Sequence, residues 1–209
     1  MKTSTGLALV IAALAAHVGS GAADMATMFP TESVIISGLT DDGQMDARLL
    51  FRFDWTQVPV GVAITQAYLY LDGITYVPEE GSVCAYVAPV MAQWNADATW
   101  DGPQPGSEWT SPGGDCSYPL GDYDCLTPEI DRALRLNMTN VVMAQLAGAE
   151  KQNGFILFLI EPDVTAQDAD VSTEVMRQVK PRLELQYHDQ SPSDGVGRPA
   201  ESETQREMR

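Results

Sequence analysis

The stretch "ARLLFRFDWTQVPVGVAITQAYLYL" (residues 47–71) decides the fold class. In its first nine residues, every odd position from 47 to 55 is apolar, positions 48, 52 and 54 are charged, and Leu50 is the exception. In its last eight residues, Ala67, Leu69 and Leu71 alternate with polar or tyrosine side chains. A period of two is typical of a β-strand with one buried face. The stretch therefore predicts two strands separated by a turn near Pro59.

Further strand patterns follow along the chain. They are "SVIIS" (33–37), "VCAYV" (83–87), "VSTEVM" (171–176) and "PRLELQY" (181–187). "GFILFLI" (154–160) is apolar at both parities, as expected for a central strand covered on both sides. "TNVVMAQLAG" (139–148) predicts a short helix with Thr139 as N-cap and Gly148 as stop. Many strands and one short helix predict an all-β fold, an antiparallel β-sandwich of jelly-roll type.

The two ends of the chain differ from this folded region. Residues 1–23 are predicted to be a secretory signal peptide, because Lys2 precedes an apolar run from Gly6 to Ala16 and small residues follow; the alternative is a short membrane anchor. Residues 188–209 are polar and predict a disordered tail. The predicted domain is 24–187, and no later stretch has the length of a transmembrane helix. We therefore expect an exported protein, extracellular or on the cell surface, with no membrane span in the mature chain.

The charge of the chain excludes several partners. The formal net charge is -17, and 24 acids face only eight bases between Asp24 and Tyr187. Binding to nucleic acid needs a basic stripe that neutralises phosphates, so we expect no nucleic-acid partner. Polyanionic glycans are disfavoured for the same reason, unless a cation bridges them.

Missing residue types exclude most catalytic classes. The two histidines, His17 and His188, fall in the predicted signal peptide and tail, which argues against histidine-dependent hydrolases and histidine-ligated metals. A glycosidase needs only two carboxylates. "EIDRAL" (129–134) begins like the Glu-x-Asp-x-x-Glu strand of laminarinase-type jelly rolls, but Leu134 stands where the last glutamate would be. We therefore expect a protein that is not an enzyme.

The three cysteines suggest a disulfide in an exported chain. Cys116 and Cys125 flank the polar loop "SYPLGDYD", and we predict that they pair. Cys84 lies in the strand pattern "VCAYV" and is expected to be a buried thiol. Three pairings are open on spacing alone.

The long irregular stretch from Asp101 to about Glu129 carries the candidate site. Its acids offer the hard oxygen ligands that calcium takes, which makes calcium the candidate cofactor and Asp101, Asp115, Asp122 and Asp124 its candidate ligands. The alternative is a solvated acidic loop. Its aromatic residues are candidates for stacking on sugar rings: Trp109, Tyr118 and Tyr123. The alternative is that they cover the end of the sandwich. In the preceding "WNADATWDGP" (94–103), Trp94 and Trp100 are expected to pack into the sandwich.

Residues 30–187 carry a series of short motifs in a fixed order. They include Arg52-Phe53-Asp54, Pro59-x-Gly61, Ala67-x-Leu69-x-Leu71, Trp94 followed by Thr99-Trp100, Asn153-Gly154, and Pro181-x-Leu183 with Tyr187. The series resembles the DNRLRE domain, also grouped as carbohydrate-binding module family 96. The family's helical turn usually carries a tryptophan, which is missing here, and the loop after Trp100 is long.

The resemblance implies a secreted jelly-roll β-sandwich of the kind appended to polysaccharide-degrading enzymes or surface proteins. Alginate, a ligand in the family, is read by basic side chains and carries over poorly to this acidic chain. The leading hypothesis is a non-catalytic module that binds a polysaccharide or cell-surface glycan. The alternative is a structural extracellular protein (matrix, adhesin or filament subunit) that self-assembles, in which "ATMFPTESVIIS" (26–37) adds a strand to a neighbour.

Overall fold

The computed structural model describes residues 23–41, 43–74, 82–117, 121–126, 133–149, 151–160 and 169–189. The predicted signal peptide, apart from Ala23, and the tail from residue 190 onward lie outside the described residues. None of the helices in these ranges has the length and apolar character needed to cross a membrane.

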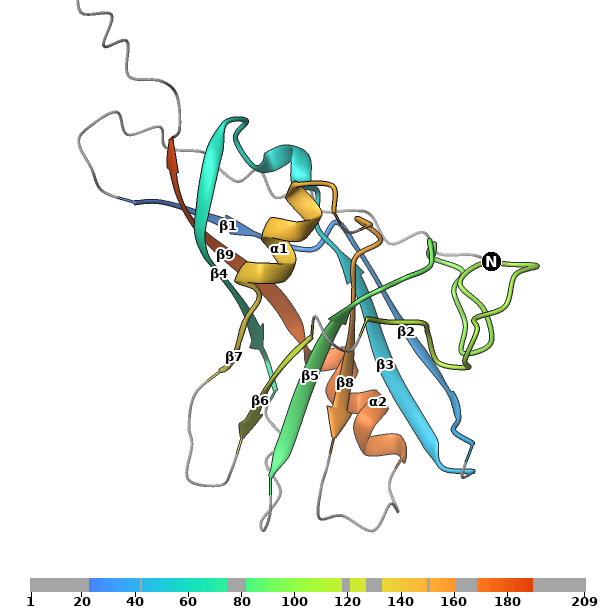
Figure 1. The fold of residues 1–209 in the computed structure, drawn as a ribbon. Helices are drawn as coiled ribbons and strands as arrows, with labels where there is room; N and C mark the ends of the chain where they lie inside the picture. Colours follow the sequence, from blue (N-terminus) through green and yellow to red (C-terminus); the bar gives the residue numbers. More distant parts are fainter. Residues whose placement is uncertain are drawn as a thin grey trace, which may run out of the picture.

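Two antiparallel sheets face each other (Figure 1). The first, sheet A, has the strand order β1 (Asp24–Met28), β9 (Lys180–Asp189), β4 (Val62–Asp72), β7 (Leu134–Asn137). The second, sheet B, has the order β2 (Glu32–Leu39), β3 (Met45–Arg52), β8 (Phe155–Ile160), β5 (Val83–Pro89), β6 (Asp122–Leu126). With β2 set aside, two four-stranded sheets in this order form a jelly roll. The predicted all-β sandwich is confirmed, although β9 extends two residues past the expected domain end and includes His188.

In the described ranges, three short helices connect the strands: η1 (Trp55–Gln57), α1 (Thr139–Leu146) and α2 (Ala169–Gln178). Asp54 caps η1, and its hydrogen bonds from the hydroxyl and amide of Thr56 lower the pKa of its carboxyl group. The structure confirms the predicted helix α1, but Met138 rather than Thr139 is at the N-cap position. The hydroxyl of Thr139 instead accepts a hydrogen bond from the amide of Ala67 in β4.

The predicted strand at 171–176 is wrong, because this segment is part of α2, a second α-helix beyond the single one expected. Val175, Met176 and Val179 are all buried, and a buried adjacent pair followed by a third apolar residue one turn later is a helical rather than a strand pattern. Val175 and Val179 are buried in the core between the sheets. The helix contacts β3 and β2, so it fills the sandwich where those two strands lie.

The core between the sheets follows the alternation of the sequence. The buried side chains there are Ala47, Leu49 and Phe51 of β3, Ala67, Leu69 and Leu71 of β4, and Leu183 and Leu185 of β9. Phe51 and Phe155 pack with ring centroids 5.7 Å apart, and Phe53 contacts both rings. Burial of each such side chain contributes about 1.5 to 3 kcal/mol, so this layer holds the two sheets together.

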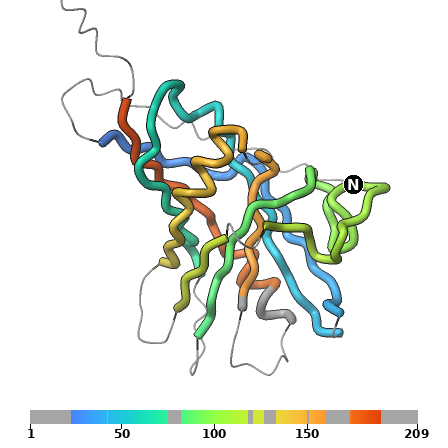
Figure 2. The backbone as a smooth tube through the Cα atoms, in the orientation of Figure 1, coloured from blue at the N-terminus to red at the C-terminus, as the bar shows by residue number. Residues whose placement is uncertain are grey.

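A second apolar core covers the outer face of sheet B. The sheet contributes Ile36, Leu50, Ala88, Ile156 and Phe158, and residues 91–117 contribute Trp94, Trp100 and Trp109. Figure 2 shows this segment, in green, looped beside the blue strands of the β2–β3 hairpin. The second core explains why Leu50 breaks the alternation of β3 and why β8 is apolar at both parities. We call residues 91–117 the covering loop.

The disulfide joins Cys84 to Cys125, so the predicted Cys116–Cys125 bridge is wrong. Cys84 and Cys125 are directly opposite each other on β5 and β6. Cys116 instead forms a bridge pair with Val90, six residues further along from Cys84. Six residues of extended chain span about 20 Å, and a disulfide requires Cα atoms within about 7 Å. Cys116 therefore lies too far along the sheet to reach Cys125.

Replacement of Cys84 by serine should lower the free energy of unfolding by about 4 kcal/mol, because the bridge closes a loop with a sequence separation of 41 residues. Urea unfolding with and without a reductant measures this loss. Cys116→Ser is the matched control and should retain the response to the reductant. A protein whose stability ignores the reductant would contradict the assignment.

Candidate functional site

The covering loop is anchored by its three tryptophans. All three side chains are buried, and each indole N–H donates to a backbone carbonyl: Trp94 to Asn153 at 2.6 Å, Trp100 to Leu39 at 2.9 Å, and Trp109 to Thr99 at 2.9 Å. The expected packing of Trp94 and Trp100 is found, but on the outer face of sheet B rather than between the sheets. A loop without regular secondary structure is thereby held in a fixed position.

The aromatic residues predicted to stack on sugars are not gathered into one platform. Trp109 is only 5% exposed, and its ring belongs to the second core. Tyr123 is 66% exposed on the edge strand β6. Tyr118 lies outside the described residues. Of the three, Tyr123 alone offers an accessible ring in the part of the chain that is described.

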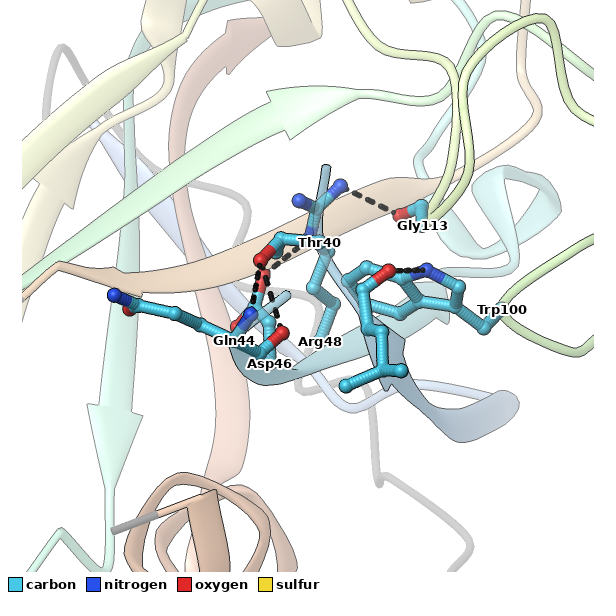
Figure 3. A network of polar contacts seen from close by, with 7 residues as sticks. Thr40, Gln44, Asp46, Arg48, Trp100 and Gly113 are labelled. Atoms are coloured by element: carbon cyan, nitrogen blue, oxygen red, sulfur yellow. Dashed lines mark hydrogen bonds and ion pairs between the residues drawn. The ribbon is translucent and has the colours of Figure 1, made fainter. Parts of the chain in front are cut away.

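Arg48 joins the covering loop to the sheet (Figure 3). Its Nε donates to Asp46 Oδ2 at 2.9 Å, and its Nη1 donates to the carbonyl of Gly113 at 2.8 Å. Its guanidinium carbon lies 4.7 Å from the centroid of the Trp100 ring and 4.5 Å from that of Phe158. A guanidinium between aromatic faces is attracted by their quadrupoles. Arg48 therefore fixes both Trp100 and the Gly113 turn.

Arg52 repeats this arrangement four residues further along the same face of β3. Its guanidinium carbon lies 4.9 Å from the ring centroid of Trp94, and its Nη2 pairs with Glu32 of β2. The alternation of the sequence assigned Arg48 and Arg52 to the solvent face of β3. The side chain of Arg48 is only 14% exposed, because that face lies beneath the covering loop. The three tryptophans of the loop were the signal in the sequence that something covers this face.

Two glycines make this close packing feasible. A Cβ on Gly38 of β2 would overlap the Trp100 ring. Gly113 has a φ of +88°, which disfavours other residues, and its amide donates to the carbonyl of Trp100 at 2.6 Å. The Trp100 ring therefore packs directly against the backbone of β2.

A cleft of about 530 Å³ opens between the covering loop and the β2–β3 hairpin. Its lining combines hydroxyl, carboxylate, guanidinium and apolar groups, contributed by Thr40, Asp41, Arg48, Met91, Trp100, Thr110, Ser111, Pro112, Gly114, Asp115 and Cys116. The cleft lies within the size range of small-ligand sites. It is the candidate functional site, and six of its lining residues lie in the long irregular stretch that the sequence singled out.

The wall of the cleft is ordered by Asp115. Its Oδ2 accepts the amide of Thr110 at 2.8 Å, and its Oδ1 accepts the amide of Ser111 at 3.0 Å. Its own carbonyl accepts the amide of Met91 at 2.9 Å. Both carboxylate oxygens thus hold the loop that carries the hydroxyls of Thr110 and Ser111.

Next to the cleft, Tyr86 packs against Cys116 and the start of β6. Burial raises the pKa of its phenol, and the charges of Cys116 and Asp122 raise it further. A hydrogen bond from the amide of Gly121 opposes this rise. The phenol of Tyr86 is therefore harder to ionise than that of an exposed tyrosine.

The acids predicted to bind calcium do not form one site. No group of three or more acidic, histidine or cysteine side chains that could hold a metal occurs among the described residues. Asp115 is engaged by amides of its own loop, and Asp101 is exposed. Calcium therefore stays a prediction, and no step of the function is assigned to this ion.

Asp122 and Asp124 have a structural role between the two sheets. The Oδ2 atom of Asp122 accepts the amide of Asn137 at 2.6 Å, and that of Asp124 accepts the amide of Arg135 at 2.9 Å. These two amides belong to β7, the edge strand of sheet A, and point away from its partner β4, since the neighbouring Met138 amide donates to β4. Two carboxylates spaced by two residues thus bind two amides spaced by two residues. We call these contacts the aspartate ladder; they close the edge of the sandwich where β6 and β7 meet.

The sequence matches no known protein-family model, and no curated protein matches it. The resemblance to the DNRLRE domain therefore stays a prediction.

The aspartate ladder predicts which substitutions destabilise the fold. Asp122→Ala and Asp124→Ala should each lower the free energy of unfolding by about 1 kcal/mol, because an edge amide loses its acceptor. Asp122→Asn and Asp124→Asn keep an acceptor oxygen and should lose less. If these residues instead held calcium, added calcium would raise the melting temperature of the wild type, and the two alanine variants would lose that response.

The packing of Trp100 against Gly38 gives a second prediction for this site. Gly38→Ala should lower the free energy of unfolding by about 1 to 3 kcal/mol, because the new methyl group overlaps the indole in a packed core. Tryptophan fluorescence should shift and the covering loop should become more sensitive to proteases. Ser37→Ala, one residue earlier and exposed, is the matched control and should leave both readouts unchanged.

Proposed function

We propose that the protein is a non-catalytic carbohydrate-binding module and that the cleft between the covering loop and the β2–β3 hairpin is its binding site. The main support for the proposal is that the cleft is lined by polar groups that suit sugar hydroxyls. The loop that contributes most of these groups is held in place by buried tryptophans and Arg48. The hydroxyls of Thr110 and Ser111 can donate and accept, and the carboxylate of Asp41 accepts. Met91, 44% exposed, adds an apolar surface for the C–H face of a sugar ring.

The charge of the cleft favours a neutral glycan. Arg48 is the single base among the residues that line it, and Asp41 and Asp115 are its two acids. The guanidinium of Arg48 is already engaged by Asp46, by Gly113 and by two aromatic rings. A uronic-acid polymer would meet a site with an excess of negative charge in a protein that is acidic throughout. We therefore expect neutral polysaccharides to bind more tightly than anionic ones.

Affinity electrophoresis of the purified protein through gels that contain neutral or uronic-acid polysaccharides tests this function. At least one neutral polysaccharide should retard the protein, and Asp41→Ala and Thr110→Ala should each weaken that binding about tenfold, the equivalent of a lost hydrogen bond worth about 1.4 kcal/mol. Asp97→Ala is the matched control, because Asp97 is an exposed acid of the same loop that does not line the cleft. Retardation that the cleft variants leave unchanged would contradict the assignment of the site, and retardation by uronic-acid gels alone would contradict the preference for neutral glycans.

The alternative function, a self-assembling structural protein of the cell surface, requires a surface through which copies associate. The edge of sheet B bears on that requirement.

A further inference from the structure

The sandwich has two edges of unequal character. At one edge, β6 and β7 are joined by the aspartate ladder, which engages the outward amides of β7. At the other edge lie β1, with five residues, and β2, with eight. Within the described part of the chain no strand pairs with the outer side of β2. β2 is therefore the longest open strand edge of the described structure.

The outward side of β2 can be identified from its hydrogen bonds. The amide of Thr40 donates to Gln44 across the hairpin, which makes this a hydrogen-bonded pair. Alternate residues of an antiparallel ladder face the same way, so Ser33, Ile35 and Ser37 direct their N–H and C=O groups away from β3. The carbonyl of Leu39, next in this series, accepts Trp100 Nε1 rather than a group of β3, as this orientation requires. Among the described residues, no hydrogen bond joins the backbone of 33–37 to a group outside the β2–β3 ladder.

The strand lacks the features by which edge strands usually avoid association. Its sequence "ESVIISGL" contains neither lysine nor proline, and Glu32 is its single charge. Ile35 packs on the main core and Ile36 in the second core, so the strand is held straight from both faces. Exposed apolar side chains lie at its two ends: Phe29 before it, Leu39 and Met45 at the hairpin. Its free backbone groups are thus fixed in place for another strand.

We propose that β2 pairs in antiparallel fashion with β2 of a second copy, about a twofold axis at Ile35. In this register Ser33 of one copy faces Ser37 of the other, and each copy donates its three outward amides. Glu32 faces Gly38, where the Trp100 ring takes the place of a side chain. Both five-stranded sheets join into one continuous sheet.

The charges on β2 and β3 are balanced, so a second copy is repelled less here than on the rest of the acidic surface. β2 and β3 carry two acids and two bases, and they are paired as Glu32 with Arg52 and Asp46 with Arg48. Two copies can approach here without opposing unpaired acids on these strands. The net charge of -17 on each chain still repels at long range. Salt shortens that range to about 10 Å at 0.1 M, so the dimer should strengthen as ionic strength rises.

The dimer also has a consequence for the cleft, which rests on the proposed function. A twofold axis perpendicular to the sheet places both covering loops on the same face of the joined sheet. Two clefts on one face can bind one polysaccharide chain or surface at two points, which raises its apparent affinity without new contacts.

Sedimentation velocity of the purified protein over a series of salt and protein concentrations tests the dimer. The expected result is a monomer at low salt that becomes a dimer as salt rises. Ser37→Lys places a charge at the interface, and Ser37→Pro removes an outward amide without loss of a β2–β3 bond; both should stay monomeric. Thr27→Lys is the matched control, because Thr27 is an exposed residue of the other open edge strand, β1, and this variant should still dimerise.

Hydrogen exchange of the wild type separates the β2 interface from any other surface. The amides of Ser33, Ile35 and Ser37 should exchange at least tenfold more slowly in the dimer than in the monomer. This measurement needs no variant and stands even if Ser37→Pro fails to fold. A protein that stays monomeric at every salt concentration overturns the proposal, as does a dimer whose three amides are unprotected or one that persists in Ser37→Lys. A wild-type protein that forms this dimer but binds no glycan would overturn the proposed function and leave the dimer standing.

Discussion

The burial of sheet B on both of its faces is the constraint on which the rest of the molecule depends. One face packs against sheet A, and the other is covered by residues 91–117 with their three tryptophans. Because the Trp100 ring of the covering loop packs directly on the backbone of β2, a residue with a side chain cannot replace Gly38 without displacing the ring. Because Arg48 extends under the loop, one side chain links the strand, the indole and the Gly113 turn. The cleft is the space left where this cover ends, and the rigidity of β2 comes from being packed on two sides.

Much of this could be predicted from the sequence, and the parts that could not have a common cause. Strand periodicity located the faces of β3, β4 and β9, and the two-sided apolar pattern of β8 indicated a covered sheet. Arg48 and Arg52 were assigned to solvent because alternation treats a charge as exposed, whereas a guanidinium packs flat against an indole. Asp122 and Asp124 suggested calcium because spaced carboxylates suit a cation, and here they suit two edge amides equally well. The predicted disulfide pairing was wrong because spacing along the chain does not show which cysteines face each other across strands. In each case the deciding partner is distant in sequence.

The treatment of its edges distinguishes this jelly roll as much as its core does. Cys125 ties β6 to β5, and the neighbouring Asp124 ties β6 to β7, so this single strand connects sheet B to sheet A at one edge. The covalent and the polar link are on adjacent residues and point to opposite faces of β6. The edge at β2 has no such device among the described residues, although β2 is the longer strand. One edge is thus closed by a pair of carboxylates, whereas the other edge has free backbone groups. Another strand can therefore add at β2 but not at the edge formed by β6 and β7.

The rigidity of the covering loop bears directly on recognition. An irregular loop that orders only when a ligand binds loses conformational entropy at that moment, and the affinity falls by that amount. Here the protein's own groups hold the loop, because buried indoles, Arg48 and the carboxylate of Asp115 each fix a separate part of it. The buried apolar area that stabilises the fold also holds the hydroxyls of Thr110 and Ser111 in place. In the proposed glycan site, the buried ring of Trp109 would support the wall of the cleft rather than stack on a sugar, and a loss of binding in a Trp109 variant would report on that support and not on a contact.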